Sequence, residues 1–142
     1  MFAWLIIPIA FAVICAENEA RRLAIALATM QKANLDEIEA DVHGRISKAS
    51  ALLDGVTVTR VTFNPGARWS QDLKEYAGTE SCELPHVAIV QQDRLHVRMD
   101  DGSEQEFGAN DVMLLPPGHD AWSVGDEACV FVEFSRGNDY YD

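Results

Sequence analysis

The chain has 142 residues, of which 48% are hydrophobic, and this length and composition suit one domain with a buried core. It carries 23 acidic residues against 11 basic ones, which gives a formal net charge of −12 at pH 7. Because such a surface repels phosphate groups, the charge argues against nucleic-acid binding and against attachment of the folded part to anionic membranes.

Residues 1–29 form an apolar amino-terminal segment for which three interpretations stay open. The run from Phe2 to Ala16 is shorter than the roughly 17–25 residues of a spanning helix, and no lysine or arginine precedes it as in a signal peptide. Arg21 and Arg22 follow it, which would keep the downstream chain in the cytoplasm if the segment inserted. The segment is therefore a signal or membrane anchor, an extension outside the fold, or a packed helix.

The three cysteines, Cys15, Cys82 and Cys129, lie far apart in the sequence. They form neither a CxxC pair nor an even-numbered disulfide framework, which favours a reducing compartment. We therefore expect a cytoplasmic protein, with export or membrane anchoring through residues 2–16 as the alternative.

Residues 30–55 are mostly polar and acidic at their start. Leu35, Ile38 and Val42 recur in them at helical spacing. This pattern predicts a polar helical arm before the main fold.

From residue 56 to residue 136 the chain has the pattern of a β protein. The stretch VTVTRVTF, residues 56–63, alternates with period two and is rich in β-branched side chains. Closely spaced strands predict an all-β sandwich or barrel over residues 56–136, followed by a polar tail at 137–142. No glycine-rich phosphate loop follows a strand, which argues against a nucleotide enzyme. Further short strands are expected at residues 87–90, 94–99, 103–107, 111–115 and 128–134.

Two motifs in this region resemble those of the cupin superfamily. The clearer one runs from Gly108 and Asp111 through an apolar strand to the corner Pro116–Gly118. The stretch PPGHDAWSVGDE, residues 116–127, is also similar to small bacterial single-domain cupins. The resemblance implies a cupin-like double-stranded β-helix, which is a jelly-roll barrel, with a small-molecule cavity that often holds a divalent metal.

The other cupin motif is altered in this chain. The resemblance places Glu80, Cys82 and His86 in positions that cupins fill with His, His and Glu, and Asp93 at the closing glycine. In an extended strand, residues 80, 82 and 86 share one face, expected to be the barrel interior. All three are competent metal ligands, and a mixture of Cys and His favours zinc over iron, manganese or nickel. The structural alternatives are a solvated acid, a plain buried thiol and a hydrogen-bonded histidine.

The fourth ligand position of cupins is occupied by Ala121, so His119 would have to replace it. The corner Pro116–Gly118 fixes two φ angles and permits a sharp turn, which aims the following side chains at a reproducible place. If strand alternation resumes after the corner, His119 faces the same cavity as Cys82 and His86. If it does not, His119 caps the turn on the surface.

Trp69, Tyr76 and Trp122 flank the candidate cavity, either as core residues or as the lining of a ligand pocket. Two classes of function stay open: a metal-binding cupin built on the four candidate ligands, and a metal-free module that binds or senses a small molecule. A third interpretation is a barrel that serves mainly in forming a homodimer. The sequence does not choose between an enzyme and a binding protein.

Overall fold

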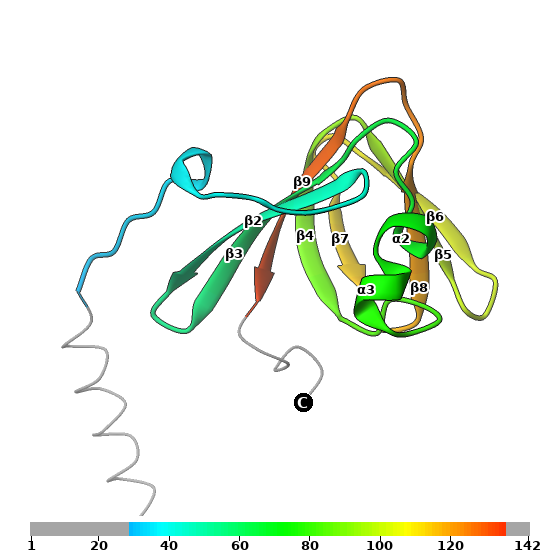
Figure 1. Cartoon of the computed structure of the whole chain (residues 1–142), viewed down its shortest axis with the longest axis horizontal. Helices are drawn as coiled ribbons and strands as arrows, with labels where there is room; N and C mark the ends of the chain where they lie inside the picture. Colours follow the sequence, from blue (N-terminus) through cyan, green and yellow to red (C-terminus); the bar gives the residue numbers. More distant parts are fainter. Residues whose placement is uncertain (1–28, 136–142) are drawn as a thin grey trace, which may run out of the picture. The chain divides into compact units, whose positions relative to one another are not determined.

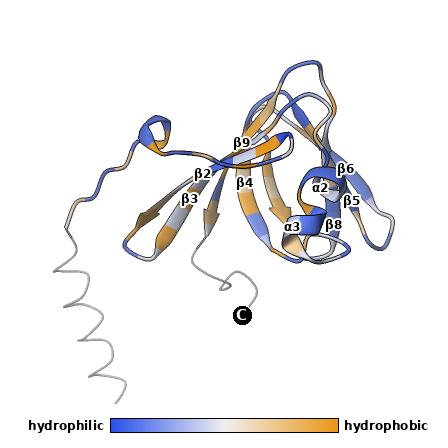
Figure 2. Ribbon diagram, viewed as in Figure 1, coloured by the Kyte–Doolittle hydropathy of each residue, from blue (hydrophilic) through white to orange (hydrophobic). Residues whose placement is uncertain are grey.

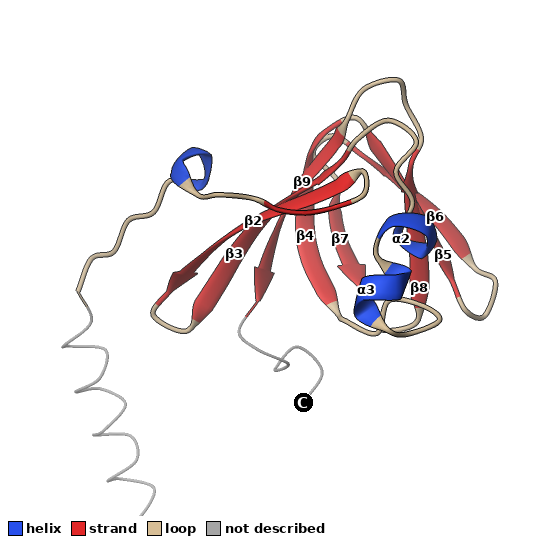
Figure 3. Ribbon diagram, in the orientation of Figure 1, coloured by secondary structure: helices blue, strands red, loops and turns tan. Residues whose placement is uncertain are grey.

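Nine strands and three short helices make up the described part, residues 29–135, of the computed structural model (Figure 1). The strands form two antiparallel sheets, one of six strands in the order β1-β2-β3-β9-β4-β7 and one of three in the order β6-β5-β8 (Figure 3). The strands are β1 Asp41–His43, β2 Ile46–Leu53, β3 Val56–Phe63, β4 His86–Gln92, β5 Arg94–Met99, β6 Glu104–Gly108, β7 Val112–Leu115, β8 His119–Ser123 and β9 Cys129–Ser135. The helices are the 3-10 helix η1 Leu35–Glu37 and the α-helices α2 Trp69–Asp72 and α3 Lys74–Ala77.

The inner faces of the two sheets enclose one hydrophobic core. Val90 and Phe131 from the six-stranded sheet share this core with Leu95 and Val97 from the three-stranded sheet. Successive side chains of a strand point to opposite sides, so the inward direction of Leu95 and Val97 sends His96 to the outside. The arrangement is the double-sheet jelly roll that the sequence predicted.

The strands after residue 56 follow the prediction closely. β3 has the predicted bounds, and each of the five later predicted strands is present with ends shifted by at most two residues. β8 was predicted only conditionally, as the strand that would turn His119 toward the cavity. α2 and α3 were not predicted. Both α-helices are four residues long, too short for hydrophobic periodicity to reveal them.

The prediction of a polar helical arm over residues 30–55 is wrong. Within it only Leu35–Glu37 is helical, and the chain then forms β1 and β2. β2 pairs with β3 along its whole length across a tight turn in which Asp54 and Gly55 have φ of 39° and 81°. An Asp-Gly pair between two extended stretches is a hairpin signal, and pairing with β3 overrides the local helical spacing.

The predictions for residues 1–28 and for the tail at 137–142 lie outside the described residues. Within residues 29–135, no helix has the length and apolar character needed to span a membrane. The cytoplasmic location stays a prediction.

Hydrophobic residues are frequent along the strands of the six-stranded sheet (Figure 2), and on β4, β7 and β9 some of them lie on its outer face. Val112 and Leu114 on β7 are 70% and 60% exposed, and Phe134 on β9 is 44% exposed. Leu114 lies opposite Val87, and Phe134 lies opposite Val58, so these side chains share one face. Strands that are apolar on both faces are typical of sheets that are covered on both sides.

Candidate metal centre

Cys82, His86 and His119 lie together inside the barrel, and one ligand atom from each lies within 4.8 Å of the other two. His86 opens β4 and His119 opens β8, while Cys82 lies before β4 and forms an isolated antiparallel bridge with His119. The backbone N–H of Cys82 donates to the carbonyl of His119 at 2.8 Å. The fold therefore brings together three of the four side chains that the sequence proposed as ligands.

The corner at Pro116–Gly118 places His119 in this cluster. Gly118 has φ of +89°, and its N–H donates to the carbonyl of Cys82 at 2.7 Å. Strand alternation resumes directly after it, because His119 and Ala121 are 3% and 5% exposed and both face the interior. His119 therefore points into the barrel, which is the first of the two outcomes considered for it.

Asp120 lies on the opposite side of β8 from His119 and anchors the strand there. Its carboxylate accepts hydrogen bonds from Arg68 Nε at 2.7 Å, from Ser70 N at 3.0 Å and from Ser70 Oγ at 2.9 Å. These contacts tie the residue next to His119 to the start of α2, which carries Trp69. The strand that carries His119 and the helix that carries Trp69 are thus joined by hydrogen bonds.

We expect Gly118→Ala to destabilise the protein by about 1–3 kcal/mol, because a non-glycine residue is strained at this φ. A Cβ at this position would also meet Asp100 Oδ2 at 2.9 Å. Gly102→Ala is the matched control, since Gly102 has φ of +87° but open space around its missing Cβ. Urea unfolding of both variants should show the larger loss for Gly118→Ala; an equal loss would mean that the contact with Asp100 contributes nothing.

Each histidine ring is held by an acceptor on its Nδ1. His86 Nδ1 lies 2.6 Å from Glu133 Oε2, and His119 Nδ1 lies 2.8 Å from the carbonyl of Pro116. A carbonyl only accepts, so His119 Nδ1 carries the hydrogen of this bond and its Nε2 is the nitrogen left to face the cluster. His86 Nε2 lies 3.4 Å from Cys82 Sγ. Metal-binding histidines almost always have such a partner on the other ring nitrogen, and the partner fixes the tautomer and the ring orientation.

Glu133 was not singled out from the sequence. It lies in the stretch ACVFVEF, where Cys129 and Phe131 at the same parity are buried core residues. A carboxylate at an inward position of an apolar strand is rare unless it is paired, and this parity was the signal that could have revealed it.

The cluster favours a thiolate and an imidazolium when no metal is bound. Burial raises the pKa of Cys82, but hydrogen bonds with His119 and His86 outweigh it and lower the pKa to about 6. Burial lowers the pKa of His86, but hydrogen bonds to Cys82 and Glu133 raise it to about 9. Cys129 is the contrast, because burial and the nearby charge of Asp93 raise its pKa to about 12.

A cavity of about 340 Å³ lies against the cluster. Of the three aromatic residues proposed from the sequence, Trp69 and Tyr76 line it. Trp122 does not: it faces the outside of the barrel, stacked on His96 with ring centroids 4.5 Å apart and covered by the Arg68 guanidinium at 4.3 Å. Trp122 follows Ala121, which faces inward, so strand alternation turns it outward.

The prediction that Glu80 joins the cluster is wrong. Its side chain is 93% exposed and its carboxylate pairs with Lys74 Nζ at 2.6 Å. The prediction assumed one extended strand through residues 80–86, but β4 begins only at His86. The chain before β4 is irregular, so strand parity does not carry back to residue 80.

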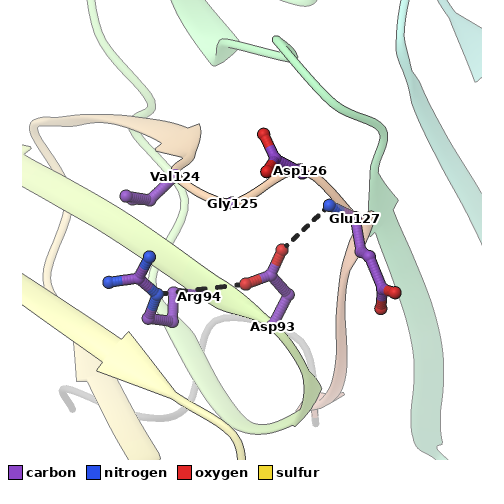
Figure 4. A pocket seen from close by; sticks show the side chains of 6 residues that line it. All are labelled: Asp93, Arg94, Val124, Gly125, Asp126 and Glu127. Atoms are coloured by element: carbon purple, nitrogen blue, oxygen red, sulfur yellow. Dashed lines mark hydrogen bonds and ion pairs between the residues drawn. The ribbon is translucent and has the colours of Figure 1, made fainter.

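A second hollow of about 360 Å³ lies between the turns that precede β5 and β9 (Figure 4). Asp93, at the position of the closing cupin glycine, has φ of 56° there. Its carboxylate accepts the Glu127 N–H at 3.3 Å and pairs with Arg94 at 3.9 Å, and a Cβ on Gly125 would collide with it. None of the candidate ligands lines this hollow. Its contacts join two turns, which is a structural role.

No protein-family model matches the sequence, and no curated protein matches it. Solved structures match its fold. An RmlC-like cupin from Shewanella frigidimarina is 16% identical, with 81% of this chain and 98% of that chain covered and a TM-score of 0.56. A sugar phosphate isomerase from a cupin superfamily, from Silicibacter pomeroyi, is 20% identical over 73% of this chain and 74% of that chain, with a TM-score of 0.55.

The structure of FeII HppE also matches, at 7% identity over 74% of this chain and 59% of that chain, with a TM-score of 0.54. Identities this low show a shared fold and not a shared activity. Together with the two-sheet topology and the interior cluster, they show that this chain has the cupin fold.

Proposed function

We propose that the protein binds one divalent metal ion, with zinc favoured, through Cys82, His86 and His119, and presents it to a small molecule in the adjoining cavity. One observation carries the proposal: three ligand atoms lie within 4.8 Å of one another, and both rings have an acceptor on the nitrogen that points away. The residues present therefore fit a metal.

The donor set supports zinc. One thiolate and two imidazoles suit zinc better than the harder ions, which prefer oxygen ligands. Three protein ligands leave a fourth position open, the arrangement found in catalytic rather than structural zinc sites. When bound, such an ion polarises a carbonyl group or lowers the pKa of a water molecule.

The chain's own residues orient the metal ligands and form the wall of the cavity. Glu133 and the carbonyl of Pro116 orient the two rings, and residues of α2 and α3 give the adjoining cavity a mostly apolar wall. The fold does not select a reaction, because one barrel supports many chemistries. A sensing module that binds the same ligand without turnover uses the same groups.

Elemental analysis of protein purified without added metal tests this proposal. We expect about one metal ion per chain, or stoichiometric uptake of zinc after dialysis. Protein that takes up no metal at any loading would favour the metal-free binding module instead.

The outer face of the six-stranded sheet favours a second role, which is pairing with another copy of the chain. The side chains that β9, β4 and β7 turn outward include no acid, although the chain carries a net charge of −12, and the first acid next to them is Asp36, which pairs with outward-facing Arg60 on β3. Two copies of an acidic chain repel each other least through a surface without carboxylates. Two copies of one sheet face can also pack on each other about a two-fold axis, which makes the interface self-complementary.

Light scattering should therefore give twice the chain mass of 15.7 kDa. Leu114→Glu should yield the monomer, because it buries charges at the centre of this face. Leu52→Glu is the matched control, since Leu52 is 72% exposed on β2 at the opposite parity to the outward residues. A monomeric wild-type protein, or a dimer that survives Leu114→Glu, would contradict this role.

A further inference from the structure

The cavity beside the cluster has mostly apolar walls. Phe63, Leu73 and Trp69 line it together with Tyr76 and Leu84. Its volume of about 340 Å³ equals that of about eleven water molecules, at roughly 30 Å³ each. The cavity therefore suits a compact apolar body of about that many non-hydrogen atoms.

Lys48 is the cation of this lining that has no partner, since the other, the His86 imidazolium, is held by Glu133 and Cys82. It lies on β2, half-buried, with its Nζ 6.0 Å from the centre of the Tyr76 ring. Among the described residues, no carboxylate lies within ion-pair distance of its ammonium group. A cation that faces a cavity without an internal partner is placed to receive a negative charge from a ligand.

The two acidic residues of the lining, Glu133 and Glu83, differ from Lys48 in their contacts and exposure. Glu133 is bonded to His86 at 2.6 Å. Glu83 is exposed and has only a long contact of 3.5 Å from Ser81 Oγ. Thr79 is the one hydroxyl of the lining apart from Tyr76, and its Oγ1 already donates to the carbonyl of Ser81. The lining thus offers one free cation and few groups for hydroxyl recognition.

We propose that the ligand of this cavity is an apolar or aromatic carboxylate of about a dozen non-hydrogen atoms, with its carboxylate on Lys48 and its body against Trp69 and Tyr76. The inference rests on the proposed function in using the same cavity, with the far end of the ligand toward the metal cluster. A sugar phosphate does not fit this proposal, because it would need many polar partners that these walls lack.

Calorimetric titration with four probes tests the ligand class. The probes are 3-phenylpropionate, its neutral amide, 3-phenylpropylamine and glucose 6-phosphate. We expect 3-phenylpropionate to bind about tenfold to a hundredfold more tightly than the amide, the range of a charge-assisted hydrogen bond. The amine and the sugar phosphate should bind more weakly still. Equal binding of acid and amide, or tighter binding of the amine or of the sugar phosphate, would overturn the proposal.

Lys48→Met should abolish the preference for the acid over the amide. Lys74→Met is the matched control, because it removes the same charge from a residue that pairs with exposed Glu80 outside this cavity. The control should keep the preference in full. A preference that survives in Lys48→Met would mean that the acid binds elsewhere, for instance on the metal, and the assignment of Lys48 would be wrong.

Running the titrations on metal-free and zinc-loaded protein separates this inference from the metal proposal. If the protein takes up no metal but still prefers the acid through Lys48, the metal proposal fails and the ligand class stands. If zinc binds stoichiometrically and no probe shows the preference, the ligand class fails and the metal proposal stands.

Discussion

Replacing Cys82 by serine, or His86 or His119 by alanine, is expected to weaken zinc binding by about a hundredfold or more. Protein zinc sites are worth about 10–16 kcal/mol, so each of three ligands contributes several kcal/mol, and each 1.4 kcal/mol is a factor of ten. Competition with a chromophoric zinc chelator measures the loss. Zinc affinity that is unchanged in any of the three variants would remove that residue from the site.

The surface histidine His96 provides the matched control. Its Nε2 lies 2.9 Å from Glu104 Oε2, so it is also a histidine held by a carboxylate, but it lies outside the cluster. His96→Ala should leave zinc affinity unchanged. Glu133→Ala should weaken it by about 10–100-fold, because the partner that orients His86 is lost. A loss in His96→Ala as large as in His86→Ala would indicate adventitious surface binding.

In metal-free protein, the Cys82 thiol should react with iodoacetamide at a rate that rises through pH 6 and is constant by pH 8. Its pKa is lowered from 9.0 to about 6, so the reactive thiolate forms about three pH units earlier than in an ordinary thiol. Both thiols are buried, but Cys82 lines the cavity and Cys129 does not, so Cys129, whose pKa is raised to about 12, should stay unreactive. Mass spectrometry of the alkylated peptides distinguishes the two cysteines. The experiment uses the Cys15→Ser variant, so that Cys15 is not alkylated as well.

The direction of the stability change follows from the same values. The pKa of Cys82 is below its ordinary value, so its thiolate contributes stability above pH 9.0, and this is lost as the pH falls through about 6. The pKa of His86 is raised from 6.5 to about 9, so its imidazolium contributes stability below pH 6.5, and this is lost as the pH rises through about 9. Both groups are charged together between about pH 6 and pH 9.

His86→Ala should move the midpoint of Cys82 alkylation to higher pH, because the imidazolium that stabilises the thiolate is gone. His96→Ala should not move it. Zinc should protect Cys82 from alkylation in the wild-type protein. A wild-type midpoint near pH 9 would contradict the close contact between Cys82 Sγ and His86 Nε2.

The strands of the barrel could be predicted because each has a pattern that is recognisable in its own local sequence. β3 and β5 alternate in polarity, and the turns between strands carry Asp-Gly and similar pairs. β2 was missed although the same signal, Asp54–Gly55, marks its hairpin. The helical spacing of Leu35, Ile38 and Val42 favoured a helix instead, but Leu35 lies in a single 3-10 turn and Val42 lies in β1, because so short a helical stretch is not stable by itself.

The candidate site could be predicted only in part. The alternation of side chains predicts which residues share a face within one strand, but it does not predict which residues of different strands lie together. His119 and His86 open two different strands; the rigid corner indicated His119, and the resemblance to the cupin motif indicated His86. Glu80 was wrong because the chain before β4 is not extended. Glu133 comes from β9, and its contact with His86 depends on how β9 and β4 pair, which no local pattern specifies.

X-ray absorption at the zinc edge of the loaded protein tests the central claim most directly, because it reports the ligand atoms themselves. The metal centre proposed here predicts one sulfur at about 2.3 Å and two imidazole nitrogens at about 2.0–2.1 Å, with the sulfur lost in Cys82→Ser. A zinc shell of oxygen and nitrogen alone in the wild-type protein would show that the ion is held elsewhere, and the proposed centre would be wrong.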